Sequence, residues 1–242
     1  MTYWKAVRLL TGQLWRREWL GMSATVVVAL YMGSLLSLNL NAMFTDEKMP
    51  EGLRGFVDWI YLLLIPCLGM VMNRTIFTTW REDSYTKRLA LYRAYPIPPS
   101  AVVGSRFTQF LLLVPINTAI AMTLEYAMSS DMRGAVSGVR WFEFAVIWAC
   151  YSLIVNAAHV LLELGVSGKR YVQGYLVWYG FVTASVVALT LAGIHPFMEV
   201  LKWTESEYAP AVVAVAVACA VLAIRAGYRA AVKRIANRSI SF

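Results

Sequence analysis

Few side chains in this sequence have the types and the spacing that chemistry requires. His159 and Glu163 are four residues apart, which would place them on one face of a helix. The pair lacks the further ligands of a metal site, so we favour a local hydrogen bond or ion pair. Glu125 interrupts an apolar run, where a carboxylate costs roughly 3 kcal/mol unless it is paired or hydrated. It is either a cavity-lining or proton-linked group, or a carboxylate near the membrane surface that water reaches.

Motifs of nucleotide-hydrolysing and other hydrolytic enzymes are absent from the sequence. It contains no G-x-x-x-x-G-K-[ST] loop for nucleotide phosphates, no H-E-x-x-H zinc motif and no G-x-S-x-G nucleophile motif. We therefore expect no catalytic residues, no metal site and no cofactor within this chain, and we do not expect it to be an enzyme.

The elements that position these residues are long and apolar. Hydrophobic residues make up 59% of the chain and charged residues 15%, against the roughly 25% charge of an average soluble domain. The apolar residues fall into six runs of ~20 residues, long enough to cross a hydrocarbon core about 30 Å thick. The runs lack the alternation of barrel strands, so they predict helices. The predicted spans are about 20–43, 57–79, 107–129, 141–162, 175–194 and 209–228.

The net charge of +8 is unevenly distributed along the chain. Most of the 22 basic residues precede the first span, follow the second or fourth span, or belong to the tail. The positive-inside rule therefore places both termini in the cytoplasm. This distribution favours membrane orientation over nucleic-acid binding, and we expect no nucleic-acid partner. The expected location is the plasma membrane, in a bacterial cell.

Two segments outside the spans also have helical patterns. In residues 2–18 apolar side chains recur three or four residues apart among basic residues, at Trp4, Val7, Leu10 and Leu14, which predicts an amphipathic helix against the lipid of the cytoplasmic interface. The alternative is an unstructured basic leader. Residues 194–210 predict a short amphipathic helix that dips into the outer leaflet. The fold class is an all-α membrane protein in which residues 1–242 form a single domain.

The polar segment between Trp80 and Arg106 is the longest and most basic interlude between spans. It predicts a cytoplasmic helix over about residues 82–94, with an apolar and aromatic face, basic residues at its rim and prolines after it. The alternative is an ordinary basic loop that only fixes topology. The candidate docking residues are Glu82, Tyr85, Lys87, Arg88, Leu89, Tyr92 and Arg93.

Polar and aromatic residues within the spans are candidates to line a path for an amphipathic molecule. The alternative is that they hydrogen-bond between helices or anchor the chain at the membrane interface. These residues are Asn117, Glu125, Tyr175, Trp178 and Tyr179.

The polar segment resembles the corresponding part of ABC-2 type permeases. It contains Arg81-Glu82, a short helix over about 84–94, the turn Tyr95-Pro96-Ile97, and Gly104 with Arg106 before the third span. The rest of the chain is similar to that family in its six predicted spans and cytoplasmic termini.

The resemblance implies a transmembrane subunit of an ATP-binding-cassette exporter. Residues 82–94 would be a coupling helix that docks on a separate ATPase subunit, which would bind the ATP and Mg²⁺. A second permease, identical or similar, would complete the pathway for a hydrophobic or amphipathic cargo such as a drug, peptide or lipid-like molecule. Two alternatives stay open: a proton-coupled secondary transporter that depends on Glu125, and an intramembrane enzyme.

Overall fold

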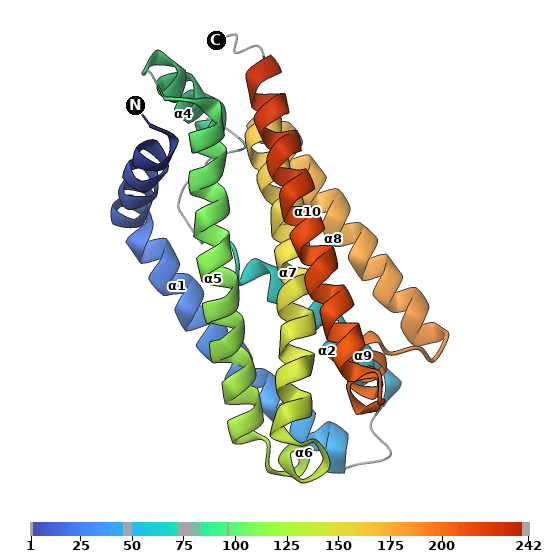
Figure 1. Cartoon of the computed structure of the whole chain (residues 1–242). Helices are drawn as coiled ribbons and strands as arrows, with labels where there is room; N and C mark the ends of the chain where they lie inside the picture. Colours follow the sequence, from blue (N-terminus) through green and yellow to red (C-terminus); the bar gives the residue numbers. More distant parts are fainter. Residues whose placement is uncertain (1, 46–49, 72–79, 81–82, 96, 239–242) are drawn as a thin grey trace.

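The chain folds into an elongated bundle of helices (Figure 1). The computed structural model describes residues 2–45, 50–71, 80, 83–95 and 97–238, without the side chains of residues 45, 84 and 85. This part of the chain contains helices and no strand. The all-α fold class is therefore confirmed.

Within the described residues, five helices are long and apolar enough to cross a membrane, as expected of a multi-pass membrane protein. They are α1 (Tyr3–Thr45), α5 (Pro99–Met128), α7 (Gly138–Gly165), α8 (Gly168–Leu191) and α10 (Ala209–Asn237). The last four cover most or all of the predicted spans 107–129, 141–162, 175–194 and 209–228, in that order. Each of these helices also extends beyond its predicted span at one end or at both.

The predicted span over residues 57–79 is represented in the structure by α2 (Glu51–Cys67). The helix begins before the predicted span and ends within it, and residues 72–79 lie outside the described residues. The count of six spans therefore stays a prediction.

Residues 3–18 are helical, as predicted, but they are not set apart as an element of their own. One helix, α1, runs without a break through both that segment and the predicted first span. The physical reason is local: residues 3–45 contain no proline, so nothing removes a backbone hydrogen bond or forces the helix to end. Its position at the membrane interface stays a prediction.

Three shorter helices complete the described chain: α4 (Ser84–Ala94), α6 (Ser130–Ala135) and α9 (Pro196–Glu205). Helix α4 lies within the predicted cytoplasmic helix and α9 within the predicted segment 194–210. Asp83 precedes α4 with a φ of 45°, a left-handed conformation that aspartate tolerates better than most residues, and its side chain caps the helix. Whether α9 enters a lipid leaflet stays a prediction.

The bundle is built mainly from two packed pairs, α1 with α5 and α7 with α10. The backbones of the first pair approach closely at Gly33, where an added Cβ would lie 2.6 Å from the carbonyl oxygen of Ala121. Small residues permit such close packing of helices in membranes.

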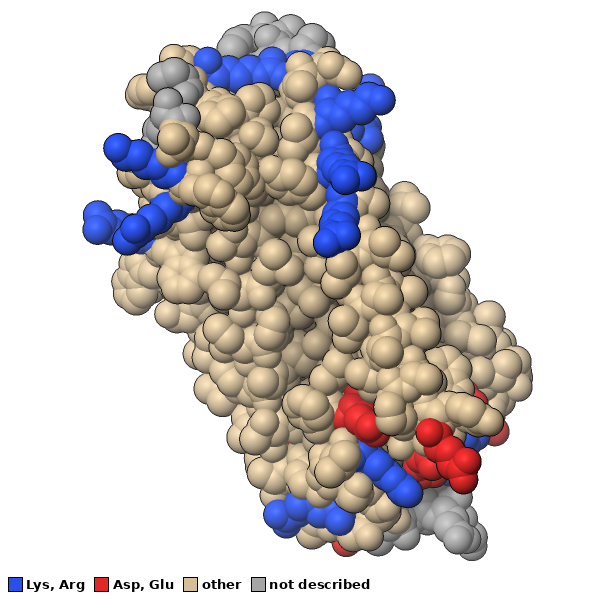
Figure 2. All heavy atoms as spheres, viewed as in Figure 1, with Lys and Arg blue, Asp and Glu red and all other residues tan. Residues whose placement is uncertain are grey.

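The two ends of the bundle differ in charge. Helix α4, the start of α1 and the end of α10 lie at one end, which we call the terminal end, and α6 and α9 lie at the other (Figure 1). Figure 2 shows only basic charged side chains over the terminal end on this face, and both acidic and basic side chains near the opposite end. Between them the visible surface is largely uncharged, as expected where lipid covers a protein.

Candidate functional site

A network of buried charges lies beneath α4 at the terminal end. We call it the terminal ion network, and its members are Glu18, Arg88, Arg106, Gln109 and Glu163. Arg106 of α5 is its centre: Nη1 lies 3.3 Å from Glu18 Oε2, and Nε donates to Glu163 Oε1 at 3.0 Å. The network therefore joins α1, α5 and α7 through one guanidinium group.

The remaining contacts complete the network around Glu18. Arg88 Nη1 of α4 donates to Glu18 Oε1 at 3.2 Å, and Gln109 Nε2 donates to Glu18 Oε2 at 3.0 Å. Arg106 Nη1 also donates to Gln109 Oε1 at 2.6 Å, and Arg106 Nη2 donates to Glu163. Both carboxylates thus accept hydrogen bonds from charged donors, which are stronger than bonds between neutral groups.

The charges of the network balance, since two carboxylates face two guanidinium groups. Only 2% of the Glu18 side chain, 10% of Glu163 and 14% of Arg106 are exposed. Buried charges are tolerated when they are paired and hydrogen-bonded, and removing one partner is strongly destabilising. The network therefore fixes the relative positions of the helices that contribute to it.

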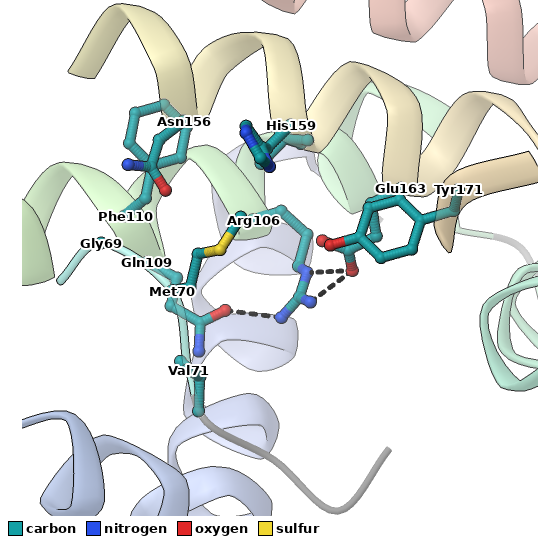
Figure 3. Close-up of a pocket in the computed structure, with 11 residues that line it drawn as sticks. Gly69, Met70, Val71, Arg106, Gln109, Phe110, Asn156, His159, Glu163 and Tyr171 are labelled. Atoms are coloured by element: carbon teal, nitrogen blue, oxygen red, sulfur yellow. Dashed lines mark hydrogen bonds and ion pairs between the residues drawn. The ribbon is translucent and has the colours of Figure 1, made fainter. Parts of the chain in front are cut away.

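A cavity of about 50 Å³ lies beside the network. Figure 3 shows Arg106 between Gln109 and Glu163, with His159 and Met70 near it. The volume suits about three water molecules, and the lining offers them polar partners. His159 is buried, and its Nδ1 makes no hydrogen bond to the described residues. This nitrogen is therefore available to a water molecule in the cavity.

The expected local pair of His159 and Glu163 is not among the contacts of the described chain. Glu163 instead accepts from Arg106, whose guanidinium group offers more donors than an imidazole. The ring of His159 packs edge-on against Tyr175, with 4.8 Å between the ring centroids. The two residues do lie four apart on one helix, α7, but the partner of Glu163 comes from another helix, α5.

Helix α4 is attached to the bundle at both of its ends. At its start, Asp83 Oδ1 accepts from the backbone nitrogen of Gly168 at 2.9 Å, which joins α4 to α8. Near its end, Arg93 donates to the backbone oxygen of Ile235, which joins it to α10. Between them Leu89 is 3% exposed and lies in an apolar cluster with residues of α5, α7 and α10.

These contacts correct the predicted docking face. Leu89 faces the chain's own core, so a partner subunit cannot contact it in this structure. Tyr92 is half-buried against the cluster of Ala6, Val7 and Leu10. Two of the three predicted rim residues, Arg88 and Arg93, bind groups of the chain itself.

The outward side of α4 consists of other residues. Lys87 is exposed, and Leu91 and Tyr95 are 55% and 56% exposed. Glu82 and the side chain of Tyr85 lie outside the described residues. The sequence predicts the helix itself, but it does not show which side of the helix faces the bundle.

The predicted pathway residues of α5 lie deep in the bundle. Asn117 is fully buried and its Nδ2 donates to Leu68 O at 2.7 Å, which joins α5 to the end of α2. Glu125 is also fully buried, and its Oε2 accepts from the hydroxyl group of Tyr61. Its Oε1 has no partner in the described part of the chain.

The other pathway candidates lie on α8 instead. Tyr179 Oη lies 3.2 Å from Cys67 Sγ, and Tyr175 Oη donates to Met70 Sδ at 3.2 Å. Trp178 packs at the edge of an apolar cluster centred on Leu63. The candidates therefore form one group within α5 and another between α8 and α2.

Asp58 is a further buried acidic residue, which the sequence pattern did not single out. It lies within the predicted span 57–79 and is fully buried. Its Oδ2 lies 2.9 Å from His195 Nδ1 and its Oδ1 accepts from Phe197 N at 2.7 Å, so it fixes the start of α9 against α2. Two features of the sequence were signals of this contact: an acidic residue near the start of a predicted span, and a histidine in the last predicted outer loop.

The chain matches no protein-family model, no curated protein and no solved structure. An assignment of function therefore depends on the residues and the geometry described above.

Proposed function

We propose that the chain is the permease subunit of an ATP-binding-cassette transporter, and that α4 receives the movement of a separate ATPase subunit. Six membrane spans, a paired permease and export of a hydrophobic or amphipathic cargo are parts of the same proposal. The support is the resemblance of the segment around α4 to ABC-2 type permeases, together with the contacts that α4 makes in this structure.

The observation that carries the proposal is the attachment of α4 to several membrane-length helices at once. Arg88 connects it to α1 through Glu18, and Glu18 connects in turn to Arg106 of α5. Asp83 and Arg93 add contacts to α8 and α10. A push on α4 would therefore reach α1, α5, α8 and α10 through hydrogen bonds and ion pairs, without passing through a flexible loop.

The charge distribution supports the location that this role requires. A soluble ATPase can reach α4 only if the terminal end faces the cytoplasm. Basic side chains gather over that end without acidic ones on the face shown in Figure 2, and the positive-inside rule then favours a cytoplasmic orientation of that end. Both termini would then be cytoplasmic as well.

The outward side of α4 is the proposed contact surface. Leu91 of α4 and Tyr95, which directly follows the helix, are exposed apolar or aromatic residues, and Lys87 adds a positive charge. A short helix with an exposed apolar side chain can lie in a groove of a partner protein. ATP and Mg²⁺ would bind to that partner.

Co-purification from native membranes tests the proposal. The wild-type chain should retain a soluble ATPase with a P-loop, identified by mass spectrometry of the complex. Lys87→Glu combined with Leu91→Ser should remove it, because both side chains are exposed on α4.

The matched control is Arg17→Glu combined with Leu20→Ser, which changes an exposed basic residue and an exposed leucine of α1. This variant should keep the ATPase. Equal retention by both variants would show that α4 does not bind the partner.

A proton-coupled carrier is the second candidate, because Glu125 is fully buried and one of its oxygens has no partner among the described residues. Ionisable residues at such positions often belong to proton pathways. This candidate predicts proton flux in proteoliposomes without any ATPase, measured with an enclosed pH-sensitive dye. Glu125→Gln should abolish that flux, and an equal flux in the variant would argue against this candidate.

A further inference from the structure

An open, basic groove lies at the terminal end, where α7 and α10 end. Its volume is about 480 Å³. It is lined by Gly165, Ala230, Lys233, Arg234, Asn237 and Arg238. Three of these side chains are basic and none is acidic, so the groove has the charge of a site for an anion.

The groove has a defined shape because Arg234 crosses directly over Gly165. A Cβ added at Gly165 would lie 2.7 Å from Cδ of Arg234, so the side chain takes the space that glycine leaves. Arg238 is fixed on the other side: its Nη1 donates to Leu164 O at 3.0 Å and its Nη2 donates to Thr86 Oγ1 of α4. The guanidinium groups of Arg234 and Arg238 are thereby positioned where α7 and α10 end and α4 begins.

Positive charge is crowded at this place. Burial is the main cause that lowers the pKa of Arg238, and the neighbouring charges of Arg93 and Arg234 lower it further, while Asp83 opposes them. Among the described residues, Asp83 is the acidic group that offsets these cations. An anion in the groove would reduce their mutual repulsion.

We propose that this groove binds the phosphate group of an anionic phospholipid. Guanidinium groups bind phosphate oxygens in a bidentate manner, and lysine adds a compact charge. Basic pockets at the cytoplasmic ends of membrane helices suit lipid head groups. The inference does not depend on the ATPase partner proposed above.

The surface next to the groove indicates a lipid as the source of the phosphate. Four of the six groove-lining residues belong to the last turns of α10, a membrane-length helix whose apolar segment is mostly exposed. Val221 and Leu222, further toward the middle of α10, are 41% and 64% exposed. Acyl chains could therefore lie along the helix while the head group occupies the groove.

Native mass spectrometry of the full chain in detergent tests the site. The probes are phosphatidylglycerol and phosphatidylcholine with identical acyl chains, titrated separately. We expect preferential binding of phosphatidylglycerol. Lys233→Gln combined with Arg234→Gln should weaken it about 10- to 30-fold, given about 1 kcal/mol for each basic residue near an anionic lipid.

Two further variants distinguish binding at this groove from a general attraction of the anionic lipid to the basic end of the protein. Arg16→Gln combined with Arg17→Gln removes two exposed charges elsewhere on α1 and should leave the affinity within about twofold of wild type, because distant exposed charges are screened. Gly165→Ala keeps every charge but displaces Arg234, so it should weaken binding several-fold.

Three results would overturn the proposal. The first is wild-type affinity in the Lys233 and Arg234 double variant. The second is an equal loss in the Arg16 and Arg17 control, which would indicate attraction by total charge. The third is displacement of phosphatidylglycerol by equal concentrations of soluble glycerol phosphate, which would show that the groove takes a free phosphate and not a lipid.

Discussion

Arg88 of α4 and Glu18 of α1 form an ion pair across 70 residues of sequence, with 3.2 Å between Nη1 and Oε1. The same carboxylate binds Arg106 through its other oxygen. The short helix α4 and the membrane-length helix α5 therefore share one buried anion. Any change in the position of α4 alters the environment of a charge that also holds α5 in place.

Loss of the Glu18 charge should destabilise the protein strongly. In Glu18→Gln, Arg88 and Arg106 would stay buried without their shared carboxylate, and breaking a buried pair in this way costs about 3–5 kcal/mol. The measurement is the thermal unfolding temperature in detergent. Lys202→Gln is the control, since it removes an exposed pair with Glu199 that is worth about 0–1 kcal/mol. Equal melting temperatures for the two variants would contradict the role given to the network.

Two leucines of α4 should respond differently to truncation. Leu89→Ala removes a side chain that is 3% exposed and should cost about 2–5 kcal/mol. Leu91→Ala changes a side chain that is 55% exposed, and the free energy of unfolding should move by no more than about 0.5 kcal/mol. Denaturation of both variants under the same conditions tests the inward orientation of Leu89. The reverse order would mean that α4 is rotated from the position described.

Two glycines of α1 provide a similar contrast. In Gly33→Ala the new Cβ would meet the carbonyl oxygen of Ala121 at 2.6 Å, which forces α1 and α5 apart and should cost about 1–3 kcal/mol. Gly12 has nothing within 4 Å of its Cβ position, so Gly12→Ala should stabilise the helix by about 0.5–1 kcal/mol. Unfolding in detergent measures both effects. Equal stability of the two variants would argue against the close approach of α1 and α5.

Tyr61 and Glu125 should show energetic coupling. Tyr61→Phe removes the hydroxyl group that donates to the buried carboxyl group and should cost about 1–3 kcal/mol. Adding Glu125→Met to that variant should recover most of the loss, because both polar partners are then apolar. A double-mutant cycle on unfolding free energies measures the coupling. Strict additivity of the two substitutions would show that the hydrogen bond contributes nothing.

The helical class and most of the membrane-length helices were predictable, because the length of an apolar run depends on the membrane thickness and not on tertiary contacts. Helix ends were less predictable. α1 continues through a polar segment that hydropathy assigns to a separate element, since helical hydrogen bonds do not require apolar side chains. Likewise α5 begins at Pro99, before its apolar run.

The terminal ion network could not be predicted from spacing. Arg106 lies 88 residues after Glu18 and 57 residues before Glu163, and contacts at such separations depend on which helices pack together. The only sequence signal was the presence of single acidic residues at the ends of otherwise apolar or basic segments. Leu89 illustrates the same limit: leucines lie on both sides of α4, and tertiary packing buries Leu89 and leaves Leu91 exposed.

Site-specific photocrosslinking tests most directly whether α4 is the docking helix of an ATPase. A benzophenone amino acid is introduced at Leu91, on the outward side of α4, and at Leu222, on the exposed apolar surface of α10, and native membranes are irradiated. The account predicts a crosslinked soluble P-loop ATPase at Leu91 and none at Leu222. Crosslinks from Leu91 that contain no such ATPase would contradict it.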